Sequence, residues 1–180
     1  MSSTLTRLDP TGTDRSALTD FLAANEWPFH IGTRLSRREI TRAIHSGRSR
    51  DSENDTFWID HDPHGRLGIV RFEDLPDSPM LDLRLGERAR GRSLGAVALS
   101  AATRHVFETY PAVHRFEGTT RRDNIAMRRA FERCGWVKEC HYRQAWHTAD
   151  GRLLNSVGYA ILRSDYESGV VTPVPWNDLP

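Results

Sequence analysis

The spacing of apolar residues along the chain predicts four helices. In the segment that starts at Asp123 or Asn124, apolar side chains recur at i, i+3, i+4 and i+7, which places them on one helical face. Gly135 then follows as a typical helix stop. Ser36 and Glu39 have the spacing of a capping box ahead of another apolar stripe. The predicted helices span residues 14–24, 36–46, 93–110 and 124–134.

Alternating and short apolar runs predict strands between these helices. Leu81, Leu83 and Leu85 alternate with other residues, so they share one face of a strand. The turn-forming sequences DPHG (62–65) and TADG (148–151) separate neighbouring runs and predict hairpins. The predicted strands span residues 5–8, 56–60, 66–72, 80–85, 115–120, 136–146 and 153–162.

The order of these elements predicts an α/β (α+β) fold. Strands and helices follow one another as β-α-α-β-β-β-α-β-α-β-β, which favours a mixed central sheet of about seven strands with helices on both faces. The length of 180 residues fits a single domain, residues 1–180. We expect a proline-rich tail, residues 168–180, to lie over the surface.

Charge and composition narrow the possible function classes. The 25 Lys and Arg residues nearly balance the 24 Asp and Glu residues, which argues against a protein that coats nucleic acid or a membrane surface. The two cysteines and eight histidines have no metal-site spacing, so we expect no metal. No apolar stretch approaches the length of a membrane span, and the N-terminus lacks an apolar signal core. We therefore expect a soluble, cytoplasmic protein.

The segment from Leu81 to Ala96 carries the clearest chemical signal. A strand ends, a basic loop with glycines follows, and a helix begins, so several backbone N–H groups lie at the positive end of a helix dipole. Such a turn is typical of a diphosphate site, to which Arg90 and Arg92 can add charge-assisted hydrogen bonds. The alternative is an ordinary glycine-containing turn with solvated arginines, and the loop alone does not decide between the two.

The sequence RGRSLGA resembles the acetyl-coenzyme A pyrophosphate motif of the GNAT N-acetyltransferases, Arg/Gln-x-x-Gly-x-Gly/Ala. Arg90 matches the first position and Gly95 the last, while Ser93 stands where the middle glycine is usual. Further along, TTRRDNIAMRRAFERCGW resembles the second signature of the family, in which an Asn opens a helix that ends in Gly-aromatic; Asn124, Gly135 and Trp136 match it. The segment HYRQAWHTADGRLLNSVGYAILRSDY resembles the closing hairpin of the subgroup that includes the ribosomal-protein N-terminal acetyltransferases.

This resemblance implies transfer of an acetyl group from acetyl-CoA to an amine, on a small molecule or on a peptide or protein N-terminus. It implies the GNAT fold, in which the fourth strand (80–85) splays from the fifth (115–120) and the pantetheine arm of acetyl-CoA lies in the gap. It also implies a set of residues that hold acetyl-CoA, namely Leu83, Leu85, Arg90, Gly91, Arg92, Ser93, Leu94, Gly95, Ala96, Asn124 and Phe131.

Acetyl transfer needs a neutral amine, so a base must take a proton. Glu117 and Asp82 are the candidate bases, because both lie near the splayed strands. Residues i and i+2 share a strand face, so each acid can instead form an ordinary surface ion pair, Glu117 with Arg115 and Asp82 with Arg84. Of the two, Glu117 is preferred as the base, because its strand leads directly into the helix of Asn124.

The groups that usually serve the leaving thiolate in this family are missing. Phe131 stands where many members have Tyr, and Met127 and Trp146 stand where the ribosomal-protein subgroup has Ser and Glu. Tyr142 is a spare hydroxyl that can donate a proton. Catalysis can then rest on positioning and on an oxyanion site. A degenerate acyl-CoA-binding protein without turnover is the alternative function.

Aromatic residues of two segments are candidates for an acceptor pocket. The loop NEWPFHIGT is expected to carry aromatic side chains into the open, and His30 can contact substrate or act as a base. The alternative is that these are ordinary loop and core residues. We expect no nucleic-acid or membrane partner, and a homodimer is left open. The candidate acceptor-binding residues are Trp27, Phe29, His30 and Trp146.

Overall fold

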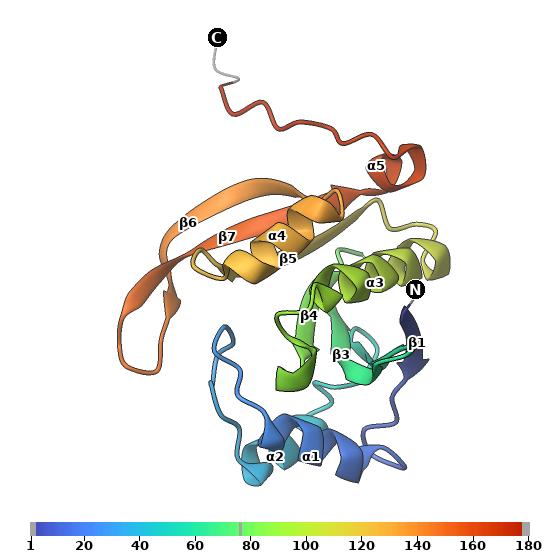
Figure 1. The fold of residues 1–180 in the computed structure, drawn as a ribbon, viewed down its shortest axis with the longest axis vertical. Coiled ribbons are helices and arrows are strands. Elements are labelled where there is room, and N and C mark those ends of the chain that lie inside the picture. Colours follow the sequence, from blue (N-terminus) through green and yellow to red (C-terminus); the bar gives the residue numbers. More distant parts are fainter. Residues whose placement is uncertain (1–2, 76, 178–180) are drawn as a thin grey trace.

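The structure is a computed structural model that describes residues 3–75 and 77–177 (Figure 1). It confirms the predicted order of strands and helices and adds two short helices that the sequence pattern did not predict, the 3₁₀ helix η1 (Glu87–Ala89) and α5 (Arg163–Ser168). The strands are β1 (Ser3–Arg7), β2 (Asp55–His61), β3 (Gly65–Glu73), β4 (Met80–Leu85), β5 (Arg115–Arg121), β6 (Val137–His147) and β7 (Leu153–Leu162). The longer helices are α1 (Arg15–Ala24), α2 (Arg37–His45), α3 (Leu94–Thr109) and α4 (Ile125–Arg133).

The strands form one mixed sheet of seven strands in the order β1-β2-β3-β4-β5-β7-β6. Every neighbouring pair is antiparallel except β4 and β5, which run parallel. These two strands pair at a single position, Met80 opposite Glu117, where the Glu117 N–H donates to the Pro79 carbonyl at 3.1 Å. Beyond that point β4 and β5 diverge, so the predicted splay between the fourth and fifth strands is confirmed.

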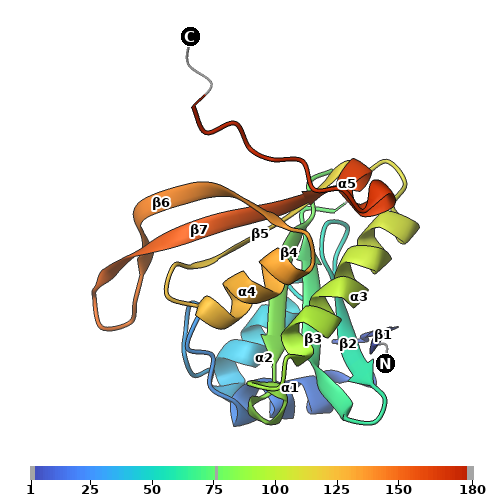
Figure 2. The same cartoon turned by 45° about the horizontal axis from the view of Figure 1, so that its top comes forward.

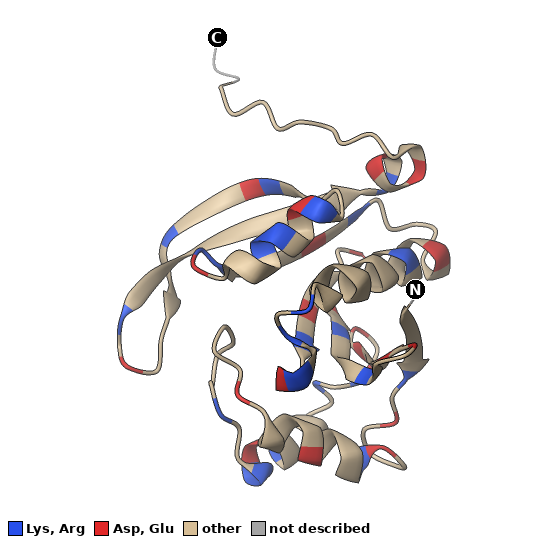
Figure 3. Cartoon of the chain, viewed as in Figure 1, with Lys and Arg blue, Asp and Glu red and all other residues tan. Residues whose placement is uncertain are grey.

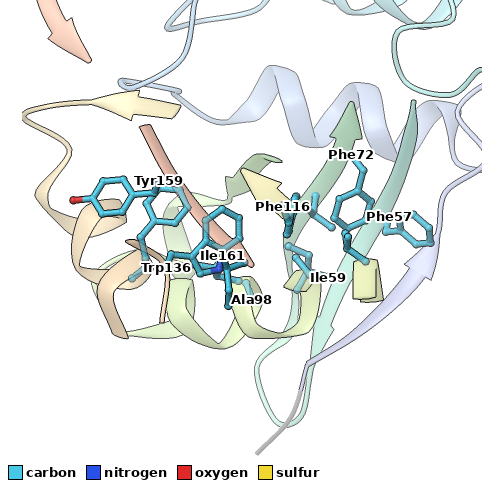
Figure 4. Close-up of a cluster of buried hydrophobic side chains, with 14 of the residues drawn as sticks. Phe57, Ile59, Phe72, Ala98, Phe116, Trp136, Tyr159 and Ile161 are labelled. Atoms are coloured by element: carbon cyan, nitrogen blue, oxygen red, sulfur yellow. The ribbon is translucent and has the colours of Figure 1, made fainter. Parts of the chain in front are cut away.

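Helices cover both faces of the sheet, as the alternation along the strands requires. In β2, Trp58 joins a core cluster with residues of α1 and α2, whereas its neighbours Phe57 and Ile59 belong to the cluster beneath α3 and α4. The second cluster is the larger one, and its aromatic side chains pack edge to face and stacked (Figure 4). The far end of the β6–β7 hairpin projects beyond both helical layers (Figure 2).

The first two helices begin in different ways, α2 at a local capping box and α1 at a residue that is tied to the sheet. The predicted capping box of α2 is formed: the Ser36 Oγ accepts the Glu39 N–H at 3.3 Å, and the Glu39 carboxylate accepts the Ser36 N–H at 2.8 Å. Asp14 occupies the N-cap position of α1, but its side chain makes no cap bond. It accepts instead from the Trp58 indole N–H and from the Asp9 N–H, both at 2.9 Å, and therefore ties the start of α1 to β2.

The C-terminal tail continues past α5 without helix or strand over residues 169–175. Lys138 Nζ lies 5.4 Å from the ring centroid of Trp176, so this part of the tail contacts β6. Residues 178–180 of the expected tail lie outside the described residues. None of the helices in residues 3–75 and 77–177 is both long enough and apolar enough to cross a bilayer.

Gly118 allows α4 to pack closely against β5 beside the splay. The Phe131 ring of α4 is 1% exposed and stacks on Tyr159 with the ring centroids 4.8 Å apart. A Cβ at Gly118 would lie 3.0 Å from the Phe131 ring and 3.4 Å from the Leu81 side chain. Because Phe131 is also packed against Trp136, the ring has little room to move.

We therefore expect Gly118→Ala to destabilise the fold by about 1–3 kcal/mol, the usual cost of overpacking a dense core. The free energy of unfolding, measured by chemical denaturation, checks this. Gly95→Ala is the matched control, because a Cβ at Gly95 would meet its nearest neighbours at 3.9 and 4.0 Å, which is ordinary contact. Equal stabilities of the two variants would contradict the prediction.

Candidate active site

A cleft of about 400 Å³ opens where β4 leaves the sheet. Its walls come from four parts of the chain: the loop between α1 and α2, the end of β4, the segment from η1 into α3, and α4 (Figure 1). Its lining residues are Trp27, Pro28, Phe29, His30, Leu83, Leu85, Ala89, Arg90, Gly91, Ser93, Gly95, Ala96, Asn124, Ala126, Met127, Arg129, Ala130 and Arg133.

The floor of the cleft is the free edge of β4. Leu83 and Leu85 lie on the α3 side of the sheet and pack against the larger core cluster. In the described part of the chain, β4 has no strand partner on its β5 side beyond Met80. Unpaired backbone groups along a strand edge are available to an extended ligand, which can add to the edge as another strand would.

The loop before α3 presents free backbone N–H groups. Gly91 and Ser93 both adopt left-handed backbone conformations, with φ of 71° and 61°. The Ser93 side chain makes no cap bond, and within the described residues the N–H groups of Gly91, Arg92 and Ser93 have no protein acceptor. They lie at the positive end of a helix of 16 residues. The predicted anion-binding geometry is therefore present at this turn.

The backbone conformation of Ser93 shows why a glycine is usual at this position of the family motif. A left-handed residue other than glycine costs about 1–2 kcal/mol, because its Cβ crowds the following carbonyl oxygen. The chain accepts this cost at Ser93 while keeping the turn. Strain of this kind persists where the surrounding structure enforces it, and it gathers at ligand-binding loops.

Arg90 has a structural role in addition to the predicted one, which stays a prediction. Its guanidinium donates to the Leu85 carbonyl at 2.8 Å and to the Glu26 carbonyl at 2.5 Å, and lies 5.2 Å from the Trp27 ring centroid. Burial lowers the pKa of the Arg90 guanidinium below its usual value. Arg90 therefore fastens the loop to β4 and to the α1–α2 segment with two of its five N–H donors, and it also lines the cleft. Arg92 is exposed and does not line the cleft.

Two arginines on α4 line the cleft and were missed from the sequence. Arg129 and Arg133 are exposed at its rim, and the basic stretches of α4 and of the loop before α3 are both visible in Figure 3. Ala126 and Ala130 line the cleft beside them. The sequence carried a signal for this pair of arginines. The i, i+3, i+4, i+7 spacing of the four residues places them on one face of α4, next to the face that packs into the core.

Of the other residues predicted to bind acetyl-CoA, most line the cleft and two lie in the core. Gly91, Ser93, Gly95 and Ala96 line the cleft, as do Leu83, Leu85 and Asn124. Leu94 and Phe131 do not: both side chains are buried in the larger core cluster, Phe131 because it stacks on Tyr159. Of Leu94, only the backbone remains for a ligand at the start of α3.

Asn124 uses both ends of its amide within the protein. Its Oδ1 accepts the Met127 N–H at 3.3 Å, which caps α4, and its Nδ2 donates to Thr120 Oγ1 at 2.9 Å. One hydrogen of the amide nitrogen is left over, and Asn124 lines the cleft. The residue therefore joins α4 to β5 beside the cleft.

The α1–α2 loop closes one side of the cleft, and its aromatics are less open than expected. Trp27 is 1% exposed, because its indole N–H donates to the Leu22 carbonyl at 3.0 Å and its ring packs on Phe21. Phe29 is half-buried, with the Arg121 guanidinium 5.0 Å from its ring centroid. The loop folds back on itself, so the expectation that it carries Trp27 into the open was wrong.

Asp82 lies at the centre of a buried ion cluster on the face of β4 that is opposite Leu83. Its carboxylate accepts from Arg71 at 2.9 Å, from Arg84 at 3.2 Å and from His30 Nε2 at 3.1 Å. Burial alone would raise the pKa of Asp82, but the charges of Arg84 and Arg71 and the hydrogen bond from His30 hold it far below its usual range. Asp82 is thus a poor proton acceptor, and its pair with Arg84 is buried rather than on the surface.

The remaining predicted site residues do not line the cleft. Glu117 pairs with Arg115 at 3.1 Å, and the same guanidinium binds Glu139 at 2.6 Å, so the alternative ion pair for Glu117 is formed. Tyr142 is 46% exposed on β6. Trp146 lies farther along the same hairpin, opposite Leu154. Their part in catalysis or binding stays a prediction.

In the part of the chain that the structure describes, no group of three or more His, Cys, Asp or Glu side chains could hold a metal ion. The polar groups that line the cleft include backbone N–H groups, arginines, the Asn124 amide and one imidazole.

Comparison with known proteins adds independent information. A family model described as an acetyltransferase (GNAT) domain matches residues 4–137. No curated protein matches the chain.

Among solved structures, the chain is similar to a spermidine N-acetyltransferase from Vibrio cholerae in complex with CoA and spermine. The TM-score is 0.74 and the identity 18%, over 92% of this chain and 98% of that one. A chimera of the Vibrio cholerae enzyme and hSSAT has a TM-score of 0.77 at 18% identity, over 93% and 99%. The Vibrio cholerae enzyme in complex with manganese ions has a TM-score of 0.72 at 18% identity, over 93% and 96%.

The ion cluster around Asp82 predicts a pH dependence of stability. Because the pKa of Asp82 is depressed in the folded state, the stabilisation is complete above the pKa of the unfolded chain, about 4, and is lost as the pH falls further. Asp82→Asn leaves Arg84 without its counter-ion and leaves Arg71 with Glu73 alone, so we expect it to lower the free energy of unfolding near neutral pH by about 3 kcal/mol. In this variant the free energy of unfolding should also fall less steeply as the pH is lowered below about 4.

Chemical denaturation at a series of pH values measures both effects. Asp62→Asn is the matched control, because Asp62 is exposed. Stability curves of the wild type and Asp82→Asn that run parallel below neutral pH would contradict the prediction.

Proposed function

Since the chain belongs to the acetyltransferase (GNAT) family and is an acyl-CoA-dependent N-acyltransferase, we propose that it acetylates a small amine or a peptide N-terminus at this cleft. The expected superfamily is thereby confirmed. The closer resemblance to ribosomal-protein N-terminal acetyltransferases is not confirmed, because the similar structures named above are spermidine N-acetyltransferases.

One observation carries the proposal: the free N–H groups before α3 and the unpaired edge of β4 border the same cleft. The N–H groups of residues 91–93 suit the diphosphate of acetyl-CoA, and Arg129 and Arg133 add positive charge at the rim. The amide groups of pantetheine suit the strand edge at Leu83 and Leu85. This arrangement directs the thioester into the gap between β4 and β5, where a backbone N–H of β4 would stabilise the oxyanion.

Gly95 leaves space for this ligand. Nothing in the protein requires a glycine there, because an added Cβ would make only ordinary contacts with Leu85 and Ala130. The residue lies in the first turn of α3, next to the free N–H groups. An absent side chain at this point serves the close approach of a ligand to the backbone.

The charges on the acceptor side favour a monoamine over a polyamine. Three acids flank the α1–α2 loop and the splay, and each is paired with an arginine: Glu26 with Arg34, Asp82 with Arg71 and Arg84, and Glu117 with Arg115. Arginines balance most of this charge, although Arg115 is shared with Glu139 and Arg71 with Glu73, so the three acids supply little attraction to a multiply charged amine. A single primary amine, on a small molecule or at a peptide N-terminus, needs no such attraction.

We expect Gly95→Ala to weaken acetyl-CoA binding at least tenfold, because the methyl group occupies the space next to the diphosphate. The melting temperature should stay the same or rise, because alanine is the better helix former. Isothermal titration calorimetry and thermal unfolding measure the two effects. Unchanged affinity in the folded variant would remove the loop from the binding site.

Turnover is tested by thiol release from acetyl-CoA with a panel of amines: simple primary amines, peptides with free N-termini, and spermidine. We expect release with members of the first two groups. If the protein binds acetyl-CoA but releases no thiol with any amine of the panel, the alternative of an acyl-CoA-binding protein is favoured. Spermidine as the best acceptor would contradict the argument from paired acids.

A further inference from the structure

His30 is held in place at the mouth of the splay. Its N–H donates to the Trp27 carbonyl at 3.1 Å, and the Trp27 N–H donates to the Thr33 carbonyl at 2.7 Å, so the loop is closed on itself. Arg121 of β5 donates to the Pro28 carbonyl at 2.8 Å and anchors the loop to the other side of the splay. The His30 ring lines the cleft and is 25% exposed.

Asp82 determines which nitrogen of His30 carries the proton. An ionised carboxylate only accepts hydrogen bonds, so His30 Nε2, 3.1 Å from Asp82 Oδ1, must be the N–H. The lone pair of the neutral ring is then on Nδ1. Within the described residues Nδ1 makes no hydrogen bond to the protein, which leaves it available to a ligand.

The charged groups around the ring favour its acting as a base. Arg71 of β3, which also pairs with Glu73, and Arg84 of β4 keep Asp82 ionised. The Asp82 carboxylate faces the imidazole directly, so it can accept the Nε2 hydrogen whether or not Nδ1 carries a proton. The other arginines near the loop are occupied: Arg121 pairs with Asp123, and Arg90 binds backbone carbonyls beside Trp27. Glu26 at the start of the loop pairs with Arg34.

His30 has no competitor among the described lining residues. The other ionisable lining side chains are arginines, which only donate hydrogen bonds, whereas a neutral imidazole carries a lone pair that can accept a proton. Glu117, the acid preferred from the sequence, is paired with Arg115 and does not line the cleft.

We propose that His30 is the general base of acetyl transfer and that Asp82 is its positioning residue; this inference rests on the proposed function. The amine nitrogen attacks the thioester carbonyl carbon, a C–N bond forms, and Nδ1 of His30 takes a proton from that nitrogen. The C–S bond then breaks, and the thiolate of CoA takes up the proton from the imidazolium. The products are the acetylated amine and CoA thiol, and the imidazole returns to its neutral form. This return of the proton also supplies the acid that Phe131, Met127 and Trp146 cannot provide.

His30→Gln tests the proposal, because glutamine keeps a polar side chain in the loop but cannot take the proton. We expect kcat to fall about 100-fold or more, the usual contribution of a general base. The affinity for acetyl-CoA, measured by calorimetry, and the melting temperature should be unchanged within error. A general base makes the kcat of the wild type rise with pH, and this rise should be absent in His30→Gln. In His30→Ala, added imidazole should restore part of the turnover.

The control is His45→Gln, which changes an exposed histidine at the end of α2 and should leave turnover unchanged. Normal kcat in His30→Gln would overturn the proposal. So would a variant that loses stability and acetyl-CoA affinity together with turnover and is not rescued by imidazole, because His30 would then only anchor the loop. Failure of the proposed function itself is distinguishable, since the wild type would then release no thiol with any amine.

Discussion

The single pairing between β4 and β5 is the constraint on which the rest of the site depends. A parallel pair that continued beyond Met80 and Glu117 would bury the edge of β4 in the sheet and leave no gap. Because the strands diverge, β4 keeps an unpaired edge in the interior of the molecule, where such edges are normally paired or covered. The packing of Phe131 over Gly118 brings α4 against the diverging strands and makes the second wall of the cleft.

The two faces of the splay have opposite character. On the α3 side the cleft is lined by leucines, alanines and glycine, with free N–H groups at its end. On the α1–α2 side Asp82 is surrounded by two guanidinium groups and an imidazole, all largely removed from water. Buried charges of this kind add little net stability, but removing one partner is costly. The cluster therefore serves to fix the α1–α2 loop and the His30 ring against β4 more than to hold the fold together.

Three arginines show that the tertiary structure decides which basic side chains are accessible at the cleft. Arg90 matches the first position of the family motif, and its guanidinium is used to fasten the loop through the Leu85 and Glu26 carbonyls. Arg129 and Arg133, in a helix whose apolar face is devoted to the core, supply the accessible positive charge at the cleft. Both outcomes follow from geometry. The extended backbone at Arg90 precedes a left-handed turn, whereas the α4 arginines lie one turn apart on the open face of the helix.

The sequence by itself determined the elements and their order, because helix and strand periodicity, the capping box at Ser36 and the stop at Gly135 are local properties. It also indicated the loop of residues 90–96, since a glycine-rich turn into a helix is a local signal. Only the tertiary structure decided that Trp27 and Phe131 are buried, and that Trp146 lies away from the cleft. Only the tertiary structure joined Asp82 to His30, 52 positions apart. Which side chains meet across such separations depends on how strands register and diverge, and no local pattern specifies that.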